Sequence, residues 1–171
     1  MKKLLLLTLL MVTSMAVNAQ NIVTVCVVDP TSTSTNIRNA PNGKVVAQLA
    51  NSELCTVDLI SVKNGWWRIS PEVEVWGDDE KTIPLTGSTS GYWIHKSMLG
   101  FNIAGDPEGC LRAAPSKGAQ AVRIAQSDYA ALYLEPLVIE GSWIKVISKD
   151  KKYTGWMPID RICANPLTTC P

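Results

Sequence analysis

The 171-residue sequence has little of several residue types on which enzyme chemistry depends. It contains one histidine, one phenylalanine and five cysteines, none of which form a C-x-x-C pair. A single histidine, His95, is too few for most metal sites and leaves a cysteine nucleophile with only one candidate base. No glycine-rich phosphate loop and no Ser–His–Asp set can be assembled. The sequence therefore predicts that the protein binds no metal and no cofactor and is not an enzyme. The alternative is a hydrolase that uses His95, which would need support from an activity lost in a His95→Ala variant.

An excess of one charge is also absent. Sixteen basic and 15 acidic residues give a formal net charge of +1. A protein that binds nucleic acid without sequence preference needs a strongly basic surface, so we expect no nucleic-acid partner. Carboxylates do cluster at Glu72 and Glu74 and in the run 78–80, where we interpret them as solvated charge on a strand and a turn.

Long apolar runs are missing except near the N-terminus. There, Lys2 and Lys3 precede an apolar run from Leu4 to Val12, and small residues end at Ala19. This order is typical of a secretory signal peptide, and the run is too short for a stable membrane span. We expect cleavage after Ala19 and a periplasmic or secreted protein without a membrane span in the mature chain. An uncleaved anchor is the alternative.

All five cysteines lie beyond the expected leader. An oxidising compartment favours disulfides, and an odd count leaves at least one cysteine over. We expect the pairs Cys26–Cys55 and Cys163–Cys170, which leaves Cys110. Metal binding is the competing interpretation, weakened by the lack of histidine.

What the chain does contain is an internal repeat. TNIRNAPNGKVVAQL at Thr35–Leu49 returns as GCLRAAPSKGAQAVRI at Gly109–Ile124, and each copy is followed by two tryptophans. The arginine recurs after 74 positions and the first tryptophan after 76. The shared positions are Arg38, Pro41, Trp67 and Trp93 in the first copy and Arg112, Pro115, Trp143 and Trp156 in the second. Such a period predicts two modules in tandem.

These motifs resemble those of the bacterial SH3 (SH3b) family: a strand with Leu/Ile-Arg-x-x-Pro, a glycine turn, a Gly-Trp-x-x-Val strand and a closing Gly-Trp-Val segment. The resemblance covers most of the chain beyond the leader and implies two SH3-like small β-barrels. It further implies that the four repeated tryptophans belong to the framework. Arg38 and Arg112 would hold the first loop through hydrogen bonds to backbone carbonyls.

Short strand-like runs between Gly, Pro and Asn turns, without helical periodicity, predict an all-β fold. We expect the first barrel at residues 20–100 and the second, with a short tail, at 101–171. A very short linker between them implies that the modules pack on each other. The first module has an extra segment at about 70–90, expected to be an extended hairpin, and a strand is expected at Ala130–Leu134.

Three aromatic residues of the first module fall outside the framework positions: Trp66, Trp76 and Tyr92. Trp66 points to the opposite face from Trp67 if both lie in one strand. The three either form an aromatic ligand surface, or cover one another, or cement the contact between modules. The corresponding candidates in the second module are Tyr129, Tyr133 and Tyr153.

The sequence thus predicts an exported, non-catalytic binding protein. The resemblance implies that its ligand is a peptidoglycan peptide or a partner protein of the cell envelope. Aromatic side chains and strand edges would recognise such an extended chain. The alternative is a protein–protein scaffold that does not bind the wall and docks through the 70–90 hairpin and exposed strand edges.

Overall fold

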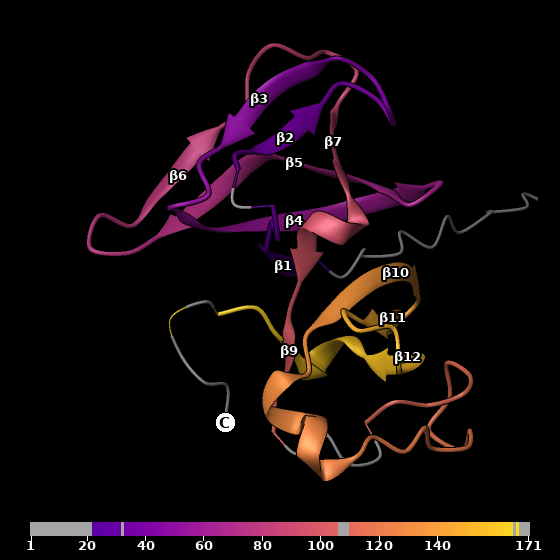
Figure 1. The fold of residues 1–171 in the computed structure, drawn as a ribbon. Coiled ribbons are helices and arrows are strands. Elements are labelled where there is room, and N and C mark those ends of the chain that lie inside the picture. The colour runs from indigo at the N-terminus through magenta and orange to yellow at the C-terminus, as the bar shows by residue number, and fades with distance from the viewer. Residues whose placement is uncertain (1–21, 32, 106–109, 166, 168–171) are drawn as a thin grey trace, which may run out of the picture.

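The computed structural model describes residues 22–31, 33–105, 110–165 and 167. The expected leader, residues 1–19, and Cys170 lie outside these residues. The described chain is mostly β-strand, with three short 3₁₀ helices: η1 (Lys96–Met98), η2 (Gln126–Ala131) and η3 (Ile159–Arg161) (Figure 1). The prediction of an all-β fold is confirmed. None of the described helices has the length and apolar character needed to cross a membrane.

An eight-stranded antiparallel sheet forms the N-terminal half, which we define as residues 22–100. Its order is β3-β2-β7-β5-β4-β1-β8, and β6 pairs with β5 beside this path. The strands are β1 (Val23–Val27), β2 (Thr35–Arg38), β3 (Val45–Leu49), β4 (Leu54–Lys63), β5 (Trp66–Trp76), β6 (Lys81–Pro84), β7 (Tyr92–His95) and β8 (Leu99–Gly100). Within the 70–90 segment, β5 and β6 form a hairpin.

The β4–β5 hairpin turns at Asn64 and Gly65, whose φ angles are +51° and +80°. Two central residues with positive φ define a type I′ turn, whose twist suits a two-residue hairpin. Trp66 therefore becomes the first residue of β5, and side chains alternate between faces from there. Trp67 and Ile69 are buried in the core, whereas Trp66 is half-buried on the outer face.

The C-terminal half, residues 101–167, contains a three-stranded sheet and a two-stranded pair. The sheet is β10 (Leu134–Glu140), β11 (Trp143–Ser148) and β12 (Thr154–Pro158); the pair is β9 (Asn102–Ile103) with β13 (Ile162–Cys163). The strand predicted at Ala130–Leu134 is wrong except for Leu134. Helix η2 covers the first two residues of that segment, and the next two lie in neither a helix nor a strand. The preceding polar residues favour a turn, in which Asp128 N donates to Ala125 O.

Both halves follow the same order of pairings. In each, a hairpin (β4–β5 or β10–β11) pairs with a closing strand (β7 or β12), which leads through a 3₁₀ turn (η1 or η3) into a short strand (β8 or β13). Arg38 lies opposite Trp93, and Arg112 forms a bridge with Trp156. Among the described residues, the strand pairings leave both sheets open.

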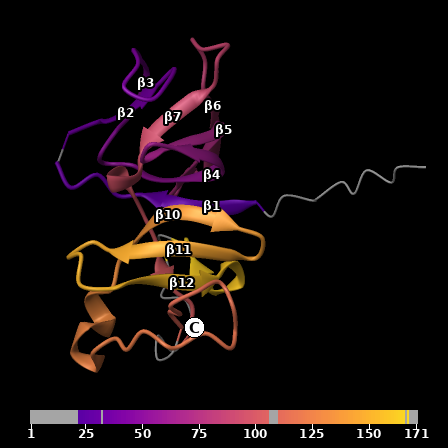
Figure 2. The same cartoon turned by 90° about the vertical axis from the view of Figure 1, so that its right-hand side faces the viewer.

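The two halves pack directly on each other, with β1 next to β10 at the boundary (Figures 1 and 2). The Trp67 indole donates to the Pro136 carbonyl at 3.0 Å across this boundary. Phe101, the only residue between β8 and β9, is fully buried and exchanges two backbone hydrogen bonds with Leu134. Buried side chains of both halves form one hydrophobic cluster.

A buried carboxylate also joins the halves. Glu135 is 1% exposed and forms ion pairs with Lys96 of η1 at 3.2 Å and with Lys151 at 2.8 Å. Burial alone would raise the pKa of Glu135, but hydrogen bonds and charge from the two lysines outweigh it, so the pKa is lowered. The ionised carboxylate is therefore part of the folded structure.

The predicted Cys26–Cys55 disulfide is wrong, since both residues are buried free cysteines. Cys26 lies opposite Thr56, whereas Cys55 precedes Thr56 in β4 and lies opposite Val75. Successive strand residues point to opposite faces, so the two sulfurs are on different sides of the sheet. The Cys26 thiol instead donates to the Ala164 carbonyl at 3.3 Å. The Cys163–Cys170 pair stays a prediction because Cys170 lies outside the described residues.

Candidate functional site

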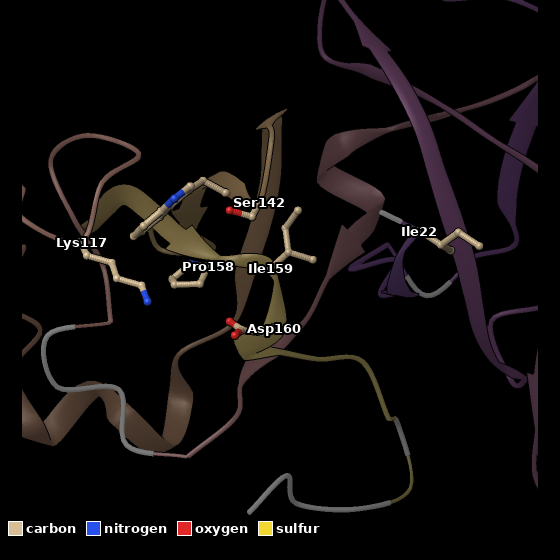
Figure 3. A pocket seen from close by; sticks show the side chains of 7 residues that line it. Ile22, Lys117, Ser142, Pro158, Ile159 and Asp160 are labelled. Carbon is tan, nitrogen blue, oxygen red and sulfur yellow. The ribbon is translucent and has the colours of Figure 1, made fainter. Parts of the chain in front are cut away.

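A groove of about 410 Å³ opens on the C-terminal half, with one residue from the N-terminal half at its side (Figure 3). Figure 3 shows Ser142, Pro158 and Ile159 between Lys117 and Ile22, with Asp160 below them. The lining residues are Ile22, Lys117, Ser142, Trp143, Pro158, Ile159 and Asp160.

Backbone geometry fixes the apolar wall of this groove. Gly141 has a φ of +58°, which lets the hairpin turn into β11 so that Trp143 begins the strand. Trp143 lies opposite Pro158, the last residue of β12. The Ile159 amide then donates to the Ser142 carbonyl at 2.9 Å. Trp143, Pro158 and Ile159 are consequently held side by side, each only half-buried.

The polar groups of the groove carry opposite charges. Lys117 and Asp160 are both exposed, and neither takes part in an ion pair between the described residues. An ammonium and a carboxylate are thus available beside an aromatic and proline surface. This combination suits an extended peptide that carries both an anionic and a cationic group, with the indole supplying contact area at a small entropy cost.

The N-terminal half has an equivalent position. Trp66 begins β5 after the Asn64–Gly65 turn, as Trp143 begins β11, and lies opposite His95, as Trp143 lies opposite Pro158. A 3₁₀ helix follows in both halves. The repeat spacing aligns Trp143 with Trp67, but the strand register aligns it with Trp66. Trp143 is therefore an outer-face residue that lines a groove, not a buried framework residue like Trp67.

The surroundings of Trp66 differ from those of Trp143. The Arg38 guanidinium carbon lies 5.8 Å from the centroid of the Trp66 ring, and the His95 ring meets it edge-on at 5.1 Å. His95 Nδ1 lies 2.7 Å from the Ser97 hydroxyl. The pKa of His95 is lowered, chiefly by burial, although the charge of Glu135 works in the other direction.

The structure does not bring Trp66, Trp76 and Tyr92 together. Trp66 and Trp76 are the two ends of β5, ten residues and so about 33 Å apart along the strand. Trp76 donates its indole hydrogen to Thr56 at 3.0 Å, beside Glu74. Tyr92 is buried and its hydroxyl donates to Leu85 O at 2.8 Å. Of the three, Trp66 lies beside a cation and a second ring, those of Arg38 and His95.

The three candidate tyrosines of the C-terminal half have separate surroundings. Tyr129 packs against the core. Tyr133 contacts Cys26 and Gly100 at the boundary of the halves, and burial raises its pKa to about 12. The Tyr153 hydroxyl donates to Asp128 at 2.8 Å and lines a cavity of about 230 Å³. They do not form one surface.

The repeated arginines contact the backbone of the loops that follow them. Arg38 Nη1 donates to Gly43 O at 2.7 Å, and Arg112 Nη1 lies 3.5 Å from Ala119 O. The resemblance implies bonds to backbone carbonyls of the first loop, which in the first module includes Asp29–Thr35. The carbonyls contacted belong instead to the loop after each arginine. Pro41 and Pro115 lie in these two loops, both half-buried.

The repeated tryptophans of the closing strands differ in burial. Trp156 is buried with the Lys145 ammonium 5.9 Å from its ring centroid, whereas Trp93 is only half-buried. Trp93 lies opposite Arg68, two residues after Trp66 in β5, so it shares the outer face of the first sheet with Trp66.

The groove residues Lys117, Pro158, Ile159 and Asp160 were not predicted from the sequence. One signal was available: a tryptophan directly after a Gly–Ser turn starts a strand on the outer face, as Trp66 does after Asn–Gly. The described residues contain no cluster of three or more metal-binding side chains. Comparison of the sequence with protein-family models and with curated proteins finds no match.

Proposed function

We propose that this protein is an exported, non-catalytic binding protein with two SH3b-like modules, and that the Trp143 groove binds a peptide of peptidoglycan. The groove itself carries the proposal: an aromatic and proline wall lies beside one ammonium and one carboxylate group. Peptide stems and cross-bridges offer the matching features, an extended backbone with both amino and carboxylate groups.

The tandem SH3b-like organisation is supported by two observations. The Arg-x-Ala-Pro and tryptophan motifs recur in one order along the chain. The strand pairings and 3₁₀ turns of the two halves follow the same order as well. Export is supported by the leader-like segment, residues 1–19. Within this organisation Trp143, the hairpin tryptophan of the second module, would be the ligand contact.

Binding rather than catalysis is supported by the surroundings of the sole histidine. His95 contacts Trp66 through its ring edge and Ser97 through Nδ1. Among the described residues that line the groove there is neither histidine nor cysteine, so the pairing of a cysteine nucleophile with a histidine base is not available there.

The test is co-sedimentation of the mature chain, from Gln20, with insoluble peptidoglycan. Trp143→Ala should weaken binding about tenfold or more, because a central aromatic contact is commonly worth about 2 kcal/mol. Trp76→Ala is the matched control, since it removes a half-buried tryptophan far from the groove, and its binding should be unchanged.

Two further variants distinguish a loss of binding from a loss of folding. Lys117→Gln and Asp160→Asn change exposed groups without removing core contacts, so each should fold normally and still weaken binding several-fold. Absence of co-sedimentation by the wild-type chain would contradict wall binding. Retention by one envelope protein in its place would support the scaffold alternative.

A further inference from the structure

The outer face of the first sheet brings basic and aromatic side chains into two neighbouring rows. Arg38, Trp93 and Arg68 lie opposite one another on β2, β7 and β5. The next row holds His95, Trp66 and Lys63 on β7, β5 and β4. We call these six residues the basic face. Paired residues on antiparallel strands share a face, so the rows are contiguous.

The cations of the basic face are available to a ligand. Arg68 and Lys63 are exposed, and Trp66 and Trp93 are half-buried. None of the ion pairs found within residues 22–31, 33–105, 110–165 and 167 uses Arg38, Lys63 or Arg68. Arg38 donates one hydrogen bond to Gly43 and keeps its other N–H groups.

Acidic side chains on the same face of β5 lie at its other end. Glu72 and Glu74 follow Arg68 by four and six residues, about 13 and 20 Å along an extended strand. Glu74 accepts a hydrogen bond from Thr56 there. Beyond about 10 Å, charges exposed to physiological salt are largely screened, so these carboxylates do not neutralise the basic face.

We propose that the basic face is a second binding site, which takes an extended acidic peptide with carboxylates at alternate positions. Arg68 and Lys63 are diagonal neighbours on β5 and β4, which places their backbones about 7–8 Å apart. Alternate side chains of an extended peptide lie about 7 Å apart on one side. Two carboxylates can therefore meet the two cations while the intervening chain lies on the indoles of Trp66 and Trp93.

Single-stranded nucleic acid also uses cations with aromatic platforms. The near-neutral chain favours the peptide, because a polyanion longer than the basic face would meet Glu72 and Glu74. The site is independent of the Trp143 groove, which belongs to the other half. A failure of one proposal therefore leaves the other standing.

The experiment compares two probes by calorimetry or tryptophan fluorescence on the mature chain: acetyl-EAEAE-amide and acetyl-QAQAQ-amide. We expect the acidic probe to bind at least fivefold more tightly at low salt, with the advantage falling as salt is raised. Arg68→Gln should remove at least threefold of that advantage. Arg123→Gln, an exposed arginine of the other half, is the matched control and should remove none. Trp143→Ala should leave acidic-probe binding unchanged.

Equal binding of the two probes, or equal losses in the Arg68 and Arg123 variants, would overturn the proposal. Tighter binding of an eight-nucleotide oligothymidylate than of the acidic probe would overturn it in favour of nucleic acid. Self-association that Arg68→Gln abolishes, without probe binding, would also overturn it and assign the face to the acidic β5–β6 hairpin of a second copy.

Discussion

Trp67→Phe should destabilise both halves of the molecule at once. Trp67 is 1% exposed, and its indole donates to the Pro136 carbonyl at 3.0 Å in the other half. The smaller ring leaves a void of roughly 40 Å³, which costs about 1 kcal/mol at about 24 cal/mol per Å³. The buried carbonyl loses its donor, which costs about 1–3 kcal/mol more. The free energy of unfolding should fall by about 2–4 kcal/mol.

For a chain of this length, that loss lowers the midpoint of thermal unfolding by about 5–15 °C. Circular dichroism gives the midpoint, and hydrogen exchange read by mass spectrometry reports each half separately. Exchange protection should fall in β10–β11 as well as in β4–β5, because the lost bond joins them. A midpoint change below about 1 °C, or lost protection in the N-terminal half only, would refute the coupling of the halves through Trp67.

Three further predictions concern buried polar groups and thiols. Glu135→Gln should lower the free energy of unfolding in urea by about 1–3 kcal/mol, since two lysines lose a buried anion, although their partial exposure limits the cost; an unchanged value would contradict the buried ion cluster. The pKa of His95 is lowered in the folded state, so the unfolded chain binds more protons below about pH 6.5 and the free energy of unfolding should fall as the pH is lowered there. His95→Gln should flatten this pH dependence. An equally steep dependence in the variant would refute the assignment of the effect to His95. Burial raises the pKa of Cys55 to about 11 and that of Cys26 as well, so both thiols should resist alkylation at pH 8 until the chain is denatured; a Cys26–Cys55 disulfide found by mass spectrometry would contradict the strand register.

The strands and turns follow from local sequence signals. Asn64–Gly65 predicts the tight hairpin of the first sheet, and both residues indeed have positive φ. Alternation from that turn places Trp67 in the core and Trp66 on the outer face. The all-β class needed nothing more than short runs, Gly and Pro turns, and the lack of helical periodicity.

Contacts that depend on strand register, or on residues distant in the sequence, could not be predicted from the sequence. The Cys26–Cys55 pair failed because one residue of register decides which face of β4 a side chain takes. The alignment of Trp143 with Trp67 was wrong by one residue for the same reason. As a result, Trp143 was assigned to the framework and the groove that it lines was not predicted. Trp76 and Tyr92 were joined to Trp66 by residue type, whereas strand length and burial separate them.

The most direct test of peptide binding at the Trp143 groove is a nuclear magnetic resonance titration with a soluble peptidoglycan stem peptide. Each of the six tryptophans contributes one indole N–H signal, so each surface has its own reporter. We predict that the Trp143 indole and the Ile159 and Asp160 amides shift first, while the buried Trp67 indole stays in place. Shifts confined to other tryptophans, or no shift at millimolar peptide, would contradict the assignment of the groove.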